Sequence, residues 1–112
     1  MELETLAIRV GADPDPATGS VAPPIHLSTN FIHGPASEET YGYTYIRDKN
    51  PTQDRLEAAL SALEGGEDAL AFSSGMGASS AFFQSLPPGS HVIIPEDVYV
   101  HVRVIAATHF RN

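Results

Sequence analysis

The chain has 112 residues, a net charge of −8 from 14 acidic against 6 basic side chains, and 42% hydrophobic residues. This length and composition suit one small globular domain rather than a disordered segment. The acidic balance argues against nucleic acid or an anionic membrane as the main partner, because both need clustered positive charge. The absence of cysteine excludes disulfide and thiolate chemistry.

The N-terminus does not resemble a targeting signal. Residues 1–5 carry acids where a signal peptide would carry bases, and no long apolar region follows. Apolar runs reach only about four residues, far short of a membrane span. We therefore expect a soluble, cytoplasmic protein with no membrane partner.

Few regular elements are predicted in the first 49 residues. Residues 1–10 alternate weakly in hydropathy, which leaves both a short helix and a strand open. Prolines and glycines in residues 11–24 indicate extended or turning chain, and residues 25–32 predict one short strand. A long stretch with so few elements is not expected to be self-contained. We expect residues 1–49 to form a largely extended N-terminal arm, which lies on a partner subunit or on the rest of a longer chain.

Three tyrosines and Arg47 follow within residues 41–47. Arginine offers a planar set of donors suited to phosphate or carboxylate, and a tyrosine hydroxyl can add a hydrogen bond. The alternative is a tyrosine-rich strand with a surface arginine. Composition alone slightly favours the strand.

The next residues carry strong helix signals. Asn50 suits the N-cap, Pro51 suits the first helical position and Gln53 falls at the third. Leu56, Ala59, Leu60 and Leu63 form one apolar stripe at helical spacing, which we expect to be buried. Gly65 or Gly66 is expected to end this helix.

From residue 50 onward, helices and apolar strands alternate. Strands are predicted at residues 69–72 and 91–94, and helices at residues 75–86 and 98–110. This alternation implies an α/β fold with a parallel sheet and right-handed crossovers. Both strands are continuously apolar, as strands covered on both faces are. Because two strands do not make a stable parallel sheet, we expect residues 50–112 to be the start of a larger α/β protein, or a truncated product.

A turn rich in serine and glycine, residues 73–77, joins the first strand to its helix. The first N–H groups of a helix lack internal partners, and the helix dipole places about half a positive charge there. Gly75 and Gly77 let an anion approach the backbone, and Ser73 and Ser74 offer hydroxyls. The turn is therefore a candidate phosphate site. A plain turn with a serine cap is the alternative, and the turn taken alone favours it.

Four motifs occur in one order: Tyr45-x-Arg47-x-x-Asn50-Pro-Thr, Leu63-Glu-Gly-Gly, Ser73-Ser-Gly-Met76, and Asp97-x-Tyr99. Together they resemble the start of the cystathionine γ-synthase-like enzymes of cysteine and methionine metabolism, over roughly residues 20–112. The resemblance implies pyridoxal 5'-phosphate (PLP) as cofactor and the three-layer fold of the type I PLP transferases, incomplete in this chain. It also implies a sulfur-containing amino-acid substrate, β- or γ-elimination or replacement, and a homo-oligomer built as a dimer of dimers.

The resemblance also assigns roles to individual residues. Gly75 and Met76 match the backbone pair that binds the cofactor phosphate, and Ser74 is a weaker candidate beside them. Tyr45 and Arg47 match the pair that reaches the phosphate in the neighbouring subunit's site. Tyr99 matches the tyrosine that stacks on the pyridine ring near the reacting amine, a role that suits an aromatic ring with a polar tip.

The chain departs from the family pattern after Tyr99. Residues 100–103 read Val-His-Val-Arg, where the family usually has Gly-Gly-Thr followed by Arg one place later. This puts the shape of the substrate pocket in doubt. His101 is either an acid or base near neutral pH or, more often at such a place, a surface or packing residue.

The family's Schiff-base lysine and the aspartate that pairs with the pyridine nitrogen are also absent. The only lysine is Lys49, in a polar loop that offers no means of activating it as a nucleophile. We therefore expect the cofactor's phosphate and ring, but not its aldehyde, to be held by these residues. No metal site is predicted.

Two other functions stay open. A catalytically inactive remnant would at most bind phosphate weakly or associate with a full-length relative. Gly75-Met-Gly-Ala-Ser-Ser80 with Asp97 also resembles a dinucleotide-binding fingerprint, although Ser80 replaces its third glycine. That interpretation leaves residues 1–49 unexplained.

Overall fold

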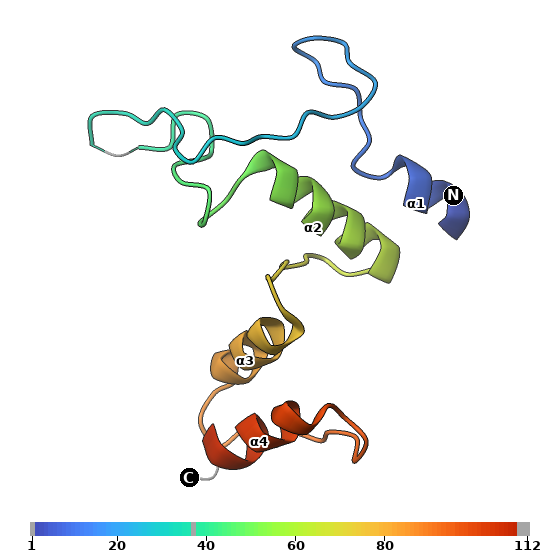
Figure 1. Ribbon diagram of the computed structural model, residues 1–112, viewed down its shortest axis with the longest axis vertical. Helices are drawn as coiled ribbons and strands as arrows, with labels where there is room; N and C mark the ends of the chain where they lie inside the picture. The colour runs from blue at the N-terminus through green and yellow to red at the C-terminus, as the bar shows by residue number, and fades with distance from the viewer. Residues whose placement is uncertain (1, 37, 110–112) are drawn as a thin grey trace. The chain divides into compact units, whose positions relative to one another are not determined.

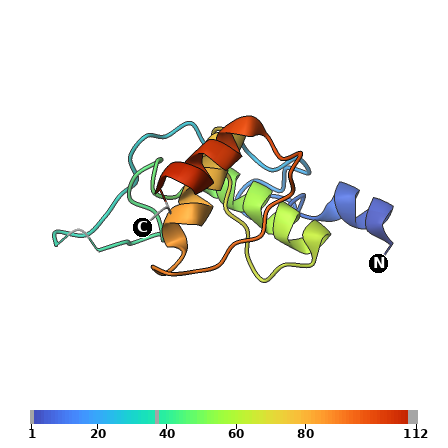
Figure 2. The same cartoon turned by 90° about the horizontal axis from the view of Figure 1, so that it is seen from below.

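The computed structural model describes residues 2–36 and 38–109 and contains, within them, four helices and no strand. The helices are α1 (Leu3–Arg9), α2 (Pro51–Glu64), α3 (Gly75–Ser85) and α4 (Val100–His109) (Figure 1). The chain divides into two compact units, Met1–Ala71 and Phe72–Asn112. Each unit contains one pair of packed helices: α1 with α2, and α3 with α4 (Figure 2).

In the first unit, the weakly alternating N-terminal residues form a helix rather than a strand. Helix α1 is followed by a turn at Gly11, whose φ of +73° lies in the left-handed region that favours glycine. A Cβ at Gly11 would also lie 3.1 Å from the Arg55 carbonyl oxygen. This glycine therefore lets the chain leave α1 and pass close to α2.

Helix α2 begins and ends where the sequence predicts. The Asn50 side chain is almost fully buried and accepts hydrogen bonds from the N–H groups of Thr52 (3.1 Å) and Gln53 (2.9 Å). Gly65 ends the helix in the left-handed conformation, with φ 68° and ψ 25°. The prediction that its apolar stripe is buried is wrong in part, since Leu56 is 51% and Leu60 39% exposed. Helix α1, with 7 residues, is too short to cover a helix of 14.

The chain between α1 and α2 is irregular. The strand predicted at residues 25–32 is reduced to one antiparallel bridge, Asn30 with Tyr45, supported by bonds from the Phe31 N–H to the Thr44 carbonyl and from the Ile46 N–H to the Thr29 carbonyl. Two further bonds tie the arm to α2: one from the His26 N–H to Thr52 Oγ1 (2.9 Å) and one from Arg55 Nη1 to the Pro24 carbonyl (2.9 Å). Residues 25–32 are thus held by isolated hydrogen bonds rather than by a strand ladder.

In the second unit, α3 and α4 pack around Phe83, which is 3% exposed. The Ser74 hydroxyl caps α3 by accepting a hydrogen bond from the Gly77 N–H at 3.0 Å. Helix α3 ends at Ser85, one residue before the predicted end, and α4 starts at Val100, two residues after the predicted start. The predicted end of the last helix, Phe110, lies outside the described residues.

The two strands of the predicted sheet are not formed within residues 2–36 and 38–109. Residues 69–72 and 91–94 have no ladder partner there, and Leu70 and Ile93 are 74% and 87% exposed. An apolar run indicates a preference for extended, buried chain, but a strand exists only where a neighbouring strand completes its backbone hydrogen bonds. The helices of the predicted α/β alternation are therefore present, while its sheet is not.

Of the helices in the described part of the chain, none combines the length and the hydropathy needed to cross a bilayer.

Candidate cofactor-binding site

A cavity of about 440 Å³ lies at the N-terminus of α3, within the second unit. It is lined by Ser74, Gly75, Met76, Ser79, Tyr99 and Val102. Four of these are site residues predicted from the sequence, so the structure brings Ser74, Gly75, Met76 and Tyr99 to one place. The volume falls within the range of about 300–1,000 Å³ typical of small-molecule sites.

The first turn of α3 presents donors to this cavity. The N–H groups of Gly77 and Ala78 bond to the Ser74 side chain and carbonyl, at 3.0 and 3.1 Å. Within the described part of the chain, the N–H groups of Gly75 and Met76 have no acceptor. Since Ser74 Oγ accepts from Gly77, its own hydroxyl proton stays available as a third donor. Two backbone amides, one hydroxyl and the positive end of the helix dipole together form an anion-binding group.

The two glycines of the turn have different surroundings. A Cβ at Gly75 would meet nothing within 4 Å, so the backbone of Gly75 faces open space that a ligand can enter. A Cβ at Gly77 would lie 3.2 Å from Ser74 Oγ, so Gly77 serves the cap rather than the cavity. The open face at Gly75 and the donors beside it fit the phosphate ester of PLP.

The cavity is also lined by three residues with large apolar parts, Met76, Tyr99 and Val102. Tyr99 is 60% exposed, and its ring centroid lies 5.2 Å from that of His101. Such a lining suits the flat face of a pyridine ring. The residues therefore fit both ends of PLP, the phosphate and the ring.

Ser79 and Val102 belong to the cavity but were not predicted from the sequence. Ser79 follows Gly75 by four residues, and its hydroxyl donates to the Gly75 carbonyl at 2.9 Å. Val102 follows Tyr99 by three residues, and its N–H donates to the Tyr99 carbonyl at 2.9 Å. Helical periodicity is the signal that could have found them, since residues three or four apart share a helix face.

The other predicted pair, Tyr45 and Arg47, lies in the first unit. Arg47 Nη1 donates to the Tyr45 hydroxyl at 2.8 Å, and the guanidinium carbon lies 4.4 Å from the centre of the tyrosine ring. The Tyr45 carbonyl accepts from the N–H groups of Asp48 and Lys49, which closes a tight turn. Arg47 is exposed and uses one of its five N–H donors on Tyr45, so the others are available for an anion.

A model of the family described as Cys/Met metabolism PLP-dependent enzymes matches residues 4–111. The chain belongs to this family. The cystathionine gamma-synthase of Mycobacterium leprae is 49% identical over 98 residues, which are 87% of this chain and 25% of that protein. The cystathionine beta-lyase of Coxiella burnetii is 38% identical over 98 residues, again 87% of this chain and 25% of that protein.

A solved structure, metB from Corynebacterium glutamicum, matches with a TM-score of 0.84 and 38% identity over 99% of this chain and 29% of that one. The chain thus spans about a quarter, 25%, of the length of the curated relatives named above. Residues 4–111 of this chain, which the family model matches, include both the residues that line the cavity at α3 and the Tyr45–Arg47 pair.

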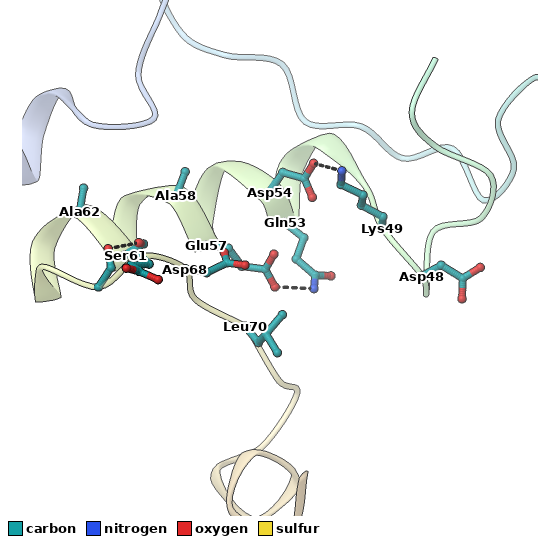
Figure 3. Close-up of a pocket in the computed structure, with 12 residues that line it drawn as sticks. Asp48, Lys49, Gln53, Asp54, Glu57, Ala58, Ser61, Ala62, Asp68 and Leu70 are labelled. Carbon is teal, nitrogen blue, oxygen red and sulfur yellow. Dashed lines mark hydrogen bonds and ion pairs between the residues drawn. The ribbon is translucent and has the colours of Figure 1, made fainter. Parts of the chain in front are cut away.

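A larger cavity, about 720 Å³, runs along α2 in the first unit (Figure 3). Its charged lining is Asp48, Lys49, Asp54, Glu57, Glu67 and Asp68. With five carboxylates against one ammonium, it would repel the phosphate of the family's cofactor. Glu57 instead serves the fold, accepting hydrogen bonds from Gln53 Nε2 (2.9 Å) and the Ala71 N–H (2.8 Å).

Lys49, the only lysine, lies in a cluster with Asp54 and Tyr43 in the same unit. Its Nζ lies 3.8 Å from Asp54 Oδ2 and 5.5 Å from the centre of the Tyr43 ring. The Tyr43 hydroxyl donates to Asp54 Oδ2 at 2.9 Å. Burial, followed by this hydrogen bond, raises the pKa of Tyr43 above its usual value. Because its ammonium is engaged by Asp54 and the Tyr43 ring, Lys49 is not suited to act as the family's cofactor-binding lysine.

Proposed function

We propose that the chain forms the phosphate- and ring-binding part of a PLP-dependent enzyme of sulfur amino-acid metabolism, of the cystathionine synthase or lyase type. The observation that carries the proposal is the cavity at α3. It joins two free backbone N–H groups, a serine hydroxyl and an aromatic ring around space that no side chain fills. The named relatives include both a synthase and a lyase, and the proposal covers both reaction types.

In this proposal, each residue of the cavity has a defined task. The N–H groups of Gly75 and Met76 bind the phosphate, with the Ser74 hydroxyl as a third donor. Tyr99 stacks against the pyridine ring and presents its hydroxyl near the reacting amine, while Val102 helps to exclude water. When bound, PLP supplies an electron sink for carbanion chemistry at the substrate's α-carbon.

The first unit is proposed to act on a second copy of the chain. Residues 1–49 would form an arm that carries Tyr45 and Arg47 to the phosphate of the neighbouring subunit, in a homo-oligomer. The exposed guanidinium and its support by the tyrosine hydroxyl favour this role. Residues 50–112 would be the first β-α units of a three-layer type I fold, in which residues 69–72 and 91–94 pair with further strands. Their exposed apolar side chains support this expectation.

A calorimetric titration of the purified chain with PLP, pyridoxal and NAD tests the cofactor assignment. PLP should bind, and pyridoxal, which lacks the phosphate, should bind at least about tenfold more weakly because the α3 donors have no anion to hold. NAD should not bind. Binding of NAD in preference to PLP would favour a dinucleotide-binding module. Equal binding of PLP and pyridoxal would contradict the phosphate site.

An inactive remnant is the second candidate, favoured by the small core. Among the described residues, Phe83 is the one hydrophobic side chain classed as buried, and Leu70 and Ile93 are largely exposed. If the chain is such a remnant, it should aggregate or unfold without a cooperative transition. Reading the coding frame past Asn112 separates the candidates. An intact enzyme should carry a PLP-binding lysine within about 150 further residues, a typical domain length.

A further inference from the structure

One feature of the second unit has no task in the proposed function: the side chain of His101. Its ring packs against Tyr99, with the ring centroids 5.2 Å apart and the planes tilted by 44°. His101 is itself exposed and lies in the first turn of α4. It lies beside Tyr99 without being among the residues that line the cavity.

The Tyr99 backbone is fixed more firmly than its ring. Its carbonyl accepts the Val102 N–H at 2.9 Å, which anchors the residue to the start of α4. The ring, however, is 60% exposed, and within residues 2–36 and 38–109 its one aromatic contact is with His101. An exposed tyrosine without such a contact would exchange among several side-chain rotamers.

We propose that His101 is a positioning residue, whose ring holds the Tyr99 phenol at the wall of the cofactor cavity. This inference rests on the proposed function, because it assumes that Tyr99 contacts the cofactor ring. A ring that is already in place loses less conformational freedom when the ligand binds. His101 therefore raises the affinity for the cofactor by holding the Tyr99 ring, and does not itself contact the cofactor.

Packing, rather than acid–base chemistry, is the role that this arrangement supports. Val102, three residues after Tyr99, lines the cavity, whereas the ring of His101, two residues after Tyr99, contacts the Tyr99 ring at a tilt. Any planar ring at position 101 could make the same contact. An aliphatic or amide side chain could not reproduce it.

PLP titrations of four variants test the proposal. H101A and H101Q should weaken PLP binding about two- to tenfold, the effect expected from one aromatic pair, and H101F should retain the original affinity. His91, exposed in the same unit, provides the matched control, since H91A should leave the affinity unchanged. Circular dichroism should show equal helix content in the wild-type chain and the variants. If H101A fails to fold, H101Q supplies the comparison.

NMR of the chain with ¹³C-labelled tyrosine gives a second measurement that does not depend on PLP. The Tyr99 ring signal, assigned by its loss in Y99F, should move on H101A substitution and stay near its original position in H101F. If wild-type chain does not bind PLP, the proposed function fails and the NMR arm alone decides the packing. Unchanged PLP affinity in H101A and H101Q, an unmoved Tyr99 signal, or an H101F variant as weak as H101A would each overturn the inference.

Discussion

At Gly75, the effect of a side chain on ligand binding can be distinguished from its effect on folding. Its backbone N–H has no acceptor in the described part of the chain, and a Cβ built on it meets nothing within 4 Å. Its conformation does not require glycine, since its φ is not among the positive values. The absence of a side chain at Gly75 therefore keeps the space beside the helix open, and the helix itself does not require it.

Gly75→Ala should consequently reduce PLP affinity about tenfold while leaving stability unchanged or slightly higher, because alanine is a better helix former than glycine. Calorimetry with PLP and a thermal melt followed by circular dichroism measure the two effects. Gly77→Ala is the matched control. Its Cβ would lie 3.2 Å from Ser74 Oγ and press on the cap, so here, unlike in Gly75→Ala, the free energy of unfolding should fall. A G75A variant that binds PLP normally would contradict the phosphate site.

Tyr43 should make the stability of the first unit depend on alkaline pH. Burial and the bond to Asp54 raise the pKa of Tyr43, so the folded state favours the protonated phenol. This contribution is fully present below about pH 10, the usual tyrosine value, and is lost as pH rises through the higher folded-state pKa.

The free energy of unfolding from urea titrations should thus decline in the wild-type chain as pH rises above about 10, the usual tyrosine pKa. Tyr43→Phe should remove part of that decline, because no phenolate then forms beside the Asp54 carboxylate. Tyr41, 70% exposed, supplies the control, since Tyr41→Phe should leave the pH profile as it is. Identical profiles for all three proteins would show that the Tyr43–Asp54 contact does not affect stability.

The helices show which features a sequence predicts and why. Capping is local: Asn50 and Ser74 each satisfy amides within three residues of themselves, so both helix starts could be predicted. Pairing of strands is not local, and the apolar runs at residues 69–72 and 91–94 indicate only a preference that other chain segments must complete. For the same reason, the predicted burial of Leu56 and Leu60 was wrong.

The candidate site follows the same division. Ser74, Gly75 and Met76 are neighbours in sequence and share one helix start, so their proximity needed no knowledge of the fold. Tyr99 was predicted as a site residue from the resemblance in motifs, and no local rule predicts that it lies beside the other three. Ser79 and Val102 belong to no motif, and only their helical spacing from Gly75 and Tyr99 indicates that they share a face with these residues.

The two caps also provide a test at the level of elements. Ser74→Ala and Asn50→Ala should each lower stability by about 1 kcal/mol, the usual cost of losing an N-cap side chain. Only Ser74→Ala should also weaken PLP binding, because Ser74 lines the cavity and Asn50 does not. Urea unfolding and PLP calorimetry on both variants measure this. Equal PLP affinity in the two variants would remove Ser74 from the site.

At the scale of the whole molecule, the distribution of apolar surface is the dominant property. Phe83 is 3% exposed, whereas Ile93 is 87% exposed in an irregular segment of the same unit. Burial makes Phe83 costly to remove. Because Ile93 is exposed, substituting it should cost little stability in the isolated chain. Its neighbours in sequence are also apolar, and an exposed apolar run favours association with another surface.

Phe83→Ala should therefore destabilise the second unit by about 3–5 kcal/mol, enough to abolish its cooperative melting. Ile93→Glu should change stability by less than about 0.5 kcal/mol but should reduce concentration-dependent association of the chain, because a charge would enter the apolar run. Thermal melts and sedimentation velocity at several concentrations measure these effects. If Ile93→Glu destabilises the chain as strongly as Phe83→Ala, residues 91–94 are buried in the isolated chain in solution, which would contradict the prediction. If association is unchanged, another apolar surface drives it.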